Sequence, residues 1–582
     1  MKVVAPTRDP WQGLPRRLWD APLWAHGVML AIVLVALIPV VGPQASFSAD
    51  EGAAIVQARS LAHGEGWTVA HPFPEADPTS RYYPLALSEH GSNGTAPFAK
   101  HPLYALVLAG AFVFGGMAAM VALSVMGTVA AATLGAALGR HLHPSLPRPT
   151  LWVLGLGSPL LFDGYLLIAH SIGAAAAAGA ALLAVRAIEN RRWTLGLAVG
   201  PVVAVAVLLR SEAALFGLAL AVTAAAVGLV KADHRWPALG VAVAAAGAAV
   251  VARVGEQAWA RHIVGAGTGT GPAQPGYEDP LGLVEGRLQA FSLTWLDPSY
   301  SGSSLLEALL LLMAVSVGAA AVIVRRRQGD SRSAQAVRAA AVVAAAASVA
   351  ALVVSPRNVV PGLLVAFPVG LAGLLLLDRR TVASLPARAL AGTFALFSLA
   401  VLATQYSRGG TAEWGGRYFA LGLPLLAPLA LDALRQHGAR LDRETARRAG
   451  GALAVCSLAL AVMAVSALRG SHQRTDELVA AFAATGRASV AVAGEKPVLV
   501  ATMGAVPRLS WSTFDDQRWL LAPPEELDDV LDGVRAAGVY RVALVTNNLG
   551  RDRLAWGEGV AVTATVASPR APWDLLVLDL GP

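Results

Sequence analysis

Long apolar segments are the feature that most limits what this chain can fold into. The first runs from residue 23 to 41 without a charged side chain, and as a helix it would cross the roughly 30 Å hydrocarbon core of a bilayer. Hydrophobic residues make up 55% of the 582 residues and charged residues only 14%, whereas soluble domains average about 25% charged residues. The sequence therefore predicts an α-helical polytopic protein of a lipid bilayer.

Short basic segments separate the apolar runs and predict their orientation. Segments such as 189–192 and 325–327 carry arginines, which the positive-inside rule places in the cytoplasm. These connectors explain the formal net charge of +7, so the charge gives no indication of nucleic-acid binding. Alternation of apolar runs and connectors gives about thirteen spans of a cytoplasmic membrane. Residues 1–22 are then cytoplasmic and the C-terminus lies outside.

The chain divides into two regions. Residues 23–469 form the predicted transmembrane region, with outer loops at 43–101 and 253–302. A break is expected at Gly115–Gly116, between a surface helix and a span. From 470 to 582 the apolar runs become short and β-branched, and they alternate with an acidic helix. That pattern predicts a small extracytoplasmic α/β domain.

The first outer loop opens with a polar helix start. Ser48 is followed three residues later by Glu51, which is a capping-box pattern, and Gly64 is a typical helix stop. Asp50 would lie in the first turn, where the helix dipole favours an ionised carboxylate. Asp50 and Glu51 are our candidate catalytic residues. The alternative is that both residues merely cap a surface helix.

Further ionisable residues fall at the predicted outer ends of the spans. Ionisable groups at membrane depth are costly and usually line a cavity or pathway. Cations there suit a phosphate, while carboxylates suit a base or a sugar ligand. We assign no metal ligands, although a divalent cation is compatible with the carboxylates. The candidate substrate-binding residues are Lys100, His101, Asp163, Arg210, Glu413, Arg417 and Tyr418.

Three of these candidates have plain structural alternatives. Lys100 is one of only four lysines in the chain and would suit a phosphate oxygen, but an interfacial lysine can also extend to water. Arg210 could simply pair with Glu212. Arg417 could be an interfacial side chain within an aromatic belt.

Four short segments give the chain a resemblance to a known family. In their order and predicted topology, they resemble the polytopic glycosyltransferases of the C superfamily, which include protein mannosyltransferases and aminoarabinose transferases. The segments are Asp50-Glu51-Gly52, Lys100-His101-Pro102-Leu103-Tyr104, Leu209-Arg210-Ser211-Glu212 and Trp414-Gly415-Gly416-Arg417-Tyr418.

The resemblance implies an activity and roles for particular residues. It implies an inverting transfer of a sugar from a polyprenyl-phosphate donor to a cell-envelope glycan, lipid or protein on the outer face. Asp50 would match the family's acidic base and Lys100 the lysine that meets the lipid phosphate. Asp163 is a candidate for a second loop acid. Many members have Lys-Pro-Pro where this chain has a histidine at position 101, which weakens the match there.

Two other classes of function fit parts of the sequence. A transporter or flippase of lipid-linked sugars would also need many spans, but such proteins place charges near the bilayer midplane, often in repeated halves. Here the charges lie at outer ends and we find no internal repeat. A non-catalytic scaffold that presents the C-terminal domain to envelope partners is the third alternative.

The predicted orientation can be tested by cysteine labelling. In a Cys456→Ala background, a membrane-impermeant thiol reagent should label single cysteines placed at Ser48 and Ala567 in intact cells. A cysteine at Gln328 should be labelled only after permeabilisation, because it follows a basic connector. Labelling of Gln328→Cys in intact cells would contradict the orientation.

Overall fold

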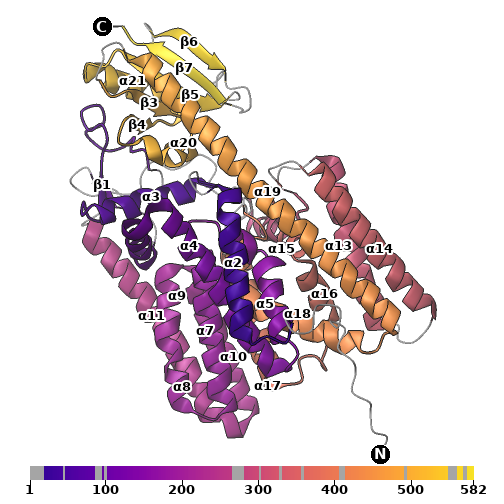
Figure 1. The fold of residues 1–582 in the computed structure, drawn as a ribbon. Coiled ribbons are helices and arrows are strands. Elements are labelled where there is room, and N and C mark those ends of the chain that lie inside the picture. The colour runs from indigo at the N-terminus through magenta and orange to yellow at the C-terminus, as the bar shows by residue number, and fades with distance from the viewer. Residues whose placement is uncertain are drawn as a thin grey trace, which may run out of the picture.

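A computed structural model describes most of the chain. Its main body is a bundle of long helices, and a mixed five-stranded sheet lies at one end of that bundle (Figure 1). The predicted fold class, a helical membrane protein with a C-terminal α/β domain, is confirmed. The residues described are 19–42, 46–85, 95–97, 101–264, 281–299, 303–326, 331–355, 359–405, 413–490, 495–547, 560–567 and 573–581.

Within these ranges, ten helices are long and apolar enough to span a membrane, which makes this an integral multi-pass protein. One of the ten combines the 3₁₀ turn η3 (Arg417–Gly422) with α18 (Leu423–Gly438), and another combines the short turn η1 (Ala232–His234) with α11 (Arg235–Val264). The other eight are α2 (Leu23–Val41), α4 (Pro102–Leu142), α7 (His170–Glu189), α10 (Glu212–Val230), α13 (Ser304–Arg326), α14 (Ser331–Val354), α17 (Leu385–Thr404) and α19 (Arg443–Ser489).

The count differs from the thirteen expected spans because three of the apolar runs form helices too short to be counted as spans. In one of these runs the helix α5 ends at Gly157. In another, Phe367 before Pro368 is non-helical and separates α15 from α16. A proline disfavours helical backbone in the residue before it and cannot donate a backbone hydrogen bond. The interrupted runs are α5 (Pro147–Leu156) with α6 (Leu160–Asp163), α8 (Trp193–Leu197) with α9 (Val199–Leu209), and α15 (Leu363–Ala366) with α16 (Pro368–Leu376).

The end of the bundle that faces the sheet carries the first outer loop. The predicted capping-box helix is present as α3 (Ala49–Ala62). The predicted break in the following apolar run is also present, since α4 loses helical geometry at Gly115 and Gly116. The second predicted loop is largely helical where it is described. The remaining elements at this end are β1 (Thr68–Ala70), β2 (Thr95–Pro97), α12 (Leu283–Phe291) and the π-helical turn η2 (Ser292–Leu296).

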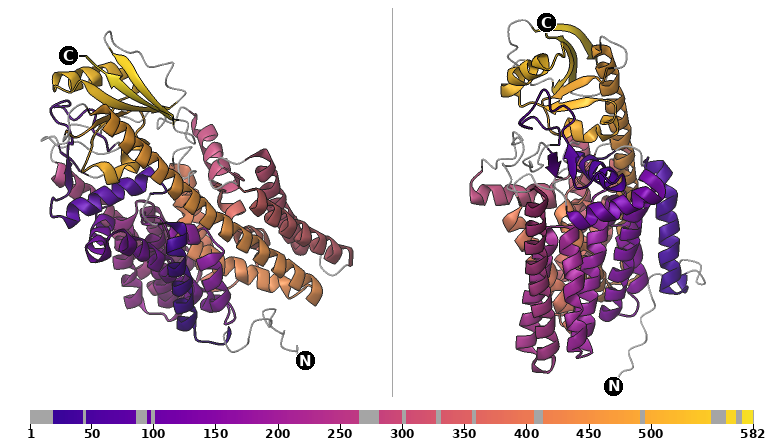
Figure 2. Two further views of the ribbon diagram at one scale, coloured as in Figure 1. Left: turned by 45° about the horizontal axis from the view of Figure 1, so that its top comes forward. Right: turned by 90° about the vertical axis from the view of Figure 1, so that its left-hand side faces the viewer.

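The C-terminal sheet is joined to the bundle by one continuous helix. α19 has 47 residues and crosses the predicted domain boundary at 470 without a break. Figure 2 shows it running from the bundle to the sheet in both views. The strand order is β4-β3-β5-β7-β6, with β3 parallel to β4 and β5 and with β7 antiparallel to β5 and β6. The strands are β3 (Val498–Ala501), β4 (Arg518–Leu521), β5 (Arg541–Asn547), β6 (Ala561–Ala567) and β7 (Trp573–Asp579).

Other parts of the chain pack on both faces of this sheet, and on one face they include residues of the predicted outer loop 43–101. On one face Phe482 of α19 packs with Trp519 and the central strands. On the other face α21 (Leu527–Ala536) packs together with Phe73 and Tyr82. The backbone N–H of Leu521 also donates to the carbonyl of Tyr82 at 2.9 Å. The remaining short helices of this region are α20 (Ala505–Leu509), η4 (Trp511–Thr513) and η5 (Pro524–Glu526).

Candidate active site

Asp50 lies where three parts of the chain meet. It is the second residue of α3, so its carboxylate stands at the positive end of the helix dipole. Its Oδ2 is 3.0 Å from Nη1 of Arg417, which begins η3, and its Oδ1 is 3.3 Å from Nη1 of Arg508 on α20. The side chain remains 18% exposed, so a second molecule can reach it.

Arg417 extends this contact into the bundle. Its Nη1 also donates to Oε1 of Glu413 at 2.9 Å, and its Nη2 donates to the hydroxyl of Tyr418 at 3.2 Å. Gly415 and Gly416 both have positive φ, at 75° and 69°, in the tight turn between Glu413 and Arg417. Glycine adopts that backbone without strain. The turn directs one arginine toward two carboxylates.

Glu413 belongs to a fully buried group of three side chains, together with Asp163 and His170. Nε2 of His170, at the start of α7, is 3.4 Å from Oε2 of Glu413, and its Nδ1 is 3.3 Å from Oδ1 of Asp163, at the end of α6. The facing carboxylate oxygens accept no hydrogen bond from the described residues. One ligand atom from each residue lies within 4.8 Å of the other two. Two carboxylates and an imidazole fit a divalent cation, so these residues could hold a metal ion.

Glu51 is buried and contacts backbone N–H groups, whereas Asp50 contacts two arginines. Glu51 is 1% exposed, and its carboxyl oxygens accept hydrogen bonds from the backbone N–H groups of Ser48 at 2.9 Å and Leu167 at 2.6 Å. Leu167 lies between Asp163 and His170. Burial raises the pKa of Glu51 to about 8, against the opposing effect of the two N–H donors. The side chain therefore caps α3 and holds the segment that carries the buried group.

The remaining predicted residues form a second set of ion pairs nearby. Arg210 donates from Nε and Nη2 to both oxygens of Glu212, at 3.1 and 2.5 Å. It also lies close enough to Glu413 and Arg417 for their charges to act on it. Nε2 of His101 accepts a hydrogen bond from the backbone N–H of Ser211 at 3.2 Å, and its Nδ1 contacts Oε1 of Glu256. Lys100 lies outside the residues that the structure describes.

The structure thus brings most of the predicted residues together and adds three. His170 was not among the residues predicted for the site, although an ionisable residue inside an apolar run is itself a signal of function. Glu256 lies in the segment predicted as the second outer loop, where an acidic residue is ordinary, so it carried no such signal. Arg508 had no sequence signal, because nothing in its neighbourhood indicates which surface that segment meets.

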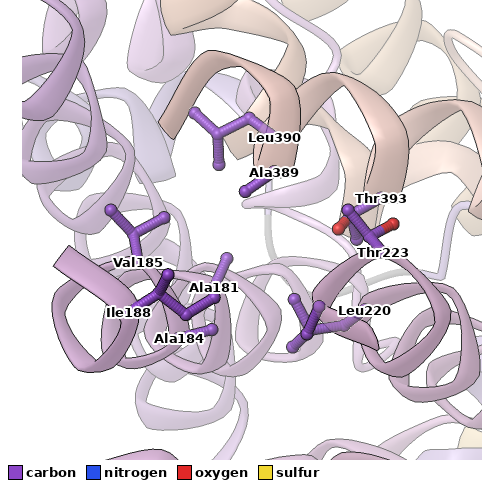
Figure 3. Close-up of a pocket in the computed structure, with 10 residues that line it drawn as sticks. Ala181, Ala184, Val185, Ile188, Leu220, Thr223, Ala389, Leu390 and Thr393 are labelled. Carbon is purple, nitrogen blue, oxygen red and sulfur yellow. The ribbon is translucent and has the colours of Figure 1, made fainter. Parts of the chain in front are cut away.

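One apolar pocket lies elsewhere, among α7, α10 and α17 (Figure 3). On α7 it starts at Ala181, about three turns beyond His170. Threonine side chains provide its only polar groups, and we assign no ligand to it. Its lining is Ala181, Ala184, Val185, Ile188, Leu220, Thr223, Ala224, Ala389, Leu390 and Thr393.

Comparison with solved structures gives the fold a name. ArnT from Cupriavidus metallidurans in the apo state matches with a TM-score of 0.50 and 14% identity, covering 95% of this chain and 97% of that chain. The chain has a glycosyltransferase C-like fold. This confirms the fold that the four sequence segments implied. No family model matches the chain, and no curated protein matches it in sequence.

Two further structures are similar at lower scores. ArnT bound to undecaprenyl phosphate has a TM-score of 0.44 at 15% identity, covering 95% of this chain and 98% of that chain. The archaeal oligosaccharyltransferase AglB from Archaeoglobus fulgidus, in complex with an inhibitory peptide and a dolichol-phosphate, has a TM-score of 0.48 at 13% identity. It covers 92% of this chain and 70% of that chain.

The raised pKa of Glu51 predicts that the stability of the folded protein depends on pH. Because the folded pKa is about 8 and the ordinary value is 4.5, the folded protein holds a proton that the unfolded chain has released between these pH values. Stability should therefore fall as pH rises from about 5 to about 8, by about 1.4 kcal/mol for each unit of pKa difference. Glu51→Gln, which is neutral at every pH, should remove this contribution.

Melting temperatures of the detergent-solubilised protein measure the effect. The wild-type and Glu51→Gln curves should diverge across that range, whatever their absolute offset. Parallel curves would show that Glu51 is ionised in the folded protein.

Proposed function

We propose that this protein is a membrane glycosyltransferase that moves a sugar from a polyprenyl-phosphate donor to a cell-envelope acceptor. The reaction takes place on the outer face of the cytoplasmic membrane. The observation that carries the proposal is the Asp50 carboxylate, partly exposed and held by Arg417 next to the buried group of Asp163, His170 and Glu413.

The fold supports the donor class. ArnT, whose apo structure has a similar fold, is described bound to undecaprenyl phosphate. A donor that is already a lipid conjugate requires no nucleotide site. The acceptor is a hydroxyl-bearing or amine-bearing glycan, lipid or protein of the envelope.

The reaction follows from the positions of the charges. Asp50 accepts the proton of the acceptor group, whose heteroatom attacks the anomeric carbon of the sugar. The bond between that carbon and the phosphate oxygen breaks, and polyprenyl phosphate leaves from the side of the sugar opposite the attacking atom, so the configuration at the anomeric carbon inverts. Asp50 ends protonated, and the released polyprenyl phosphate gains one negative charge. A carboxylate offers about four lone-pair sites, so the arginine hydrogen bonds do not by themselves prevent it from accepting this proton.

Cations at the same end of the bundle stabilise the leaving phosphate. Arg417 and Arg210 are the described candidates, and Lys100 is the third, by its place in the sequence. Arg210 is held in a defined direction by its two bonds to Glu212. His101 lies beside Ser211 in this region and helps to shape it.

A divalent cation fits the proposal. Asp163, His170 and Glu413 would hold it, and the oxygens without hydrogen-bond donors point to such a group. When bound, it supplies positive charge for the phosphate of the donor. Glu413 also contacts Arg417, so the carboxylate positions an arginine of the site in addition to any role as a ligand.

The base can be tested by Asp50→Asn. This change keeps the size of the side chain but removes the basic oxygen, so turnover should fall by roughly 10² to 10⁴ while donor binding is retained. The measurement is sugar transfer from a polyprenyl-phosphate donor to envelope acceptor in nanodiscs. Donor binding is measured separately by titration.

Glu51→Gln is the matched control, since it alters the neighbouring carboxyl that caps the helix. It should keep most of the turnover at neutral pH. Normal turnover in Asp50→Asn together with an inactive Glu51→Gln would transfer the role of base to Glu51. Normal turnover in both would remove the catalytic role from this helix start.

The metal site predicts a bound ion. Purified protein should retain a divalent cation measurable by elemental analysis, and Mn²⁺ should bind with a distinct paramagnetic spectrum. His170→Ala and Asp163→Asn should each weaken Mn²⁺ binding by roughly 10-fold or more, because each removes one ligand of the buried group.

His437→Ala is the matched control, because His437 is also buried but faces Asp378. It should bind Mn²⁺ like wild type. Equal binding in wild type and His170→Ala would mean that the buried group is held by protons and ion pairs alone.

A further inference from the structure

The C-terminal sheet region contributes α20 to the candidate active site. This helix follows the carboxyl end of β3, the side of a parallel sheet at which α/β proteins place their functional residues. It packs directly on α3, the helix that carries Asp50.

Gly52 permits the close approach. A Cβ atom at this position would lie 1.7 Å from the carbonyl oxygen of Arg508, a distance that no side chain tolerates. The glycine therefore lets the backbone of α20 lie against the first turn of α3. This accounts for the third residue of the Asp50-Glu51-Gly52 segment, which the proposed chemistry does not otherwise use.

At this contact, Arg508 shares the carboxylate of Asp50 with Arg417. Arg508 takes Oδ1 and Arg417 takes Oδ2, at 3.3 and 3.0 Å. Arg508 is 4% exposed, and its Nε donates to the carbonyl of Gly504 at 3.0 Å, which fixes its direction. Two cations on different oxygens hold the plane of the carboxylate, which one cation alone would leave free to rotate.

Docking of the sheet does not depend on this pair. The indole N–H of Trp511 donates to Ser46 at 3.2 Å, and Arg59 pairs with Asp515 at 2.5 Å. Apolar packing of Phe73 and Tyr82 adds to these contacts. Burial of an arginine carries a desolvation cost, which its pairing with a carboxylate at best offsets. An apolar side chain would serve docking as well, so the arginine has another reason to be there.

We propose that Arg508 is a positioning residue for Asp50, so that the C-terminal sheet region completes the active site of the transferase. This rests on the proposed function, in which Asp50 is the base. The arginine orients the carboxylate toward the acceptor. Transfer then requires the docked C-terminal region in addition to the membrane helices.

Arg508→Met tests the proposal in the full-length protein. Methionine keeps the apolar stem and removes the charge, so kcat should fall by roughly 10- to 100-fold from loss of orientation, with the donor KM unchanged. Arg508→Lys should recover part of the loss, because it restores a cation without the planar fork. Melting temperature is measured alongside each variant.

Gly52→Ala provides a second route to the same effect. The added methyl group must displace α20, so kcat should fall without any change of charge. The double variant Gly52→Ala/Arg508→Met should be about as slow as the slower single variant, since both changes break one contact. This variant also keeps the proposal testable if Arg508→Met does not fold.

Asp515→Asn is the matched control. It removes an ion pair across the same interface, away from the carboxylate of Asp50, and kcat should stay within about twofold of wild type. A wild-type kcat in Arg508→Met, with Asp50→Asn inactive, would overturn the positioning role and leave the proposed function intact. Equal losses in Asp515→Asn and Arg508→Met would also overturn it, in favour of general docking. Activity in both Asp50→Asn and Arg508→Met would overturn the proposed function as well.

Discussion

The ion pair between Asp50 and Arg417 joins positions 367 residues apart, and the organisation of the candidate site depends on it. From it, basic and acidic side chains alternate in both directions, and an ionised group left unpaired in a buried place would cost several kcal/mol. Each member therefore fixes the position of the next. The series runs through Arg508, Asp50, Arg417, Glu413, His170 and Asp163.

Interrupted helices make this series possible. Non-helical backbone inside a membrane protein is tolerated only where other protein groups satisfy it. The breaks here satisfy one another, because the N–H of Gly362 donates to Asp297 at 2.8 Å and the N–H of Gly415 donates to Pro361 at 2.9 Å. Gly415 also packs on Pro159, next to α6 and Asp163. The irregular segments thus converge on the site, while the regular helices keep their apolar faces outward.

The C-terminal region depends on the rest of the chain more than its sequence indicates. The short runs at 498–502, 539–546, 560–567 and 575–580 predict strands that match β3, β5, β6 and β7, and the acidic run at 524–537 predicts the helix. β4 was missed, because four residues around Trp519 carry too little periodic pattern to predict a strand. The packing of Phe73 and Tyr82 on the sheet was also not foreseen, since an irregular loop has no period that reveals which surface it covers. α19 runs as one continuous helix through both regions.

The sequence by itself determined the membrane class, the helix that starts at Ser48, the break at Gly115–Gly116 and the set of polar residues at one end of the spans. These features follow from local composition and spacing. Only the tertiary structure decided which charges meet: it separated Asp50 from the capping Glu51, placed His170 between two carboxylates and brought Arg508 to the first loop. Pairings of this kind depend on how distant helices and strands pack, and no local pattern in the chain records that packing.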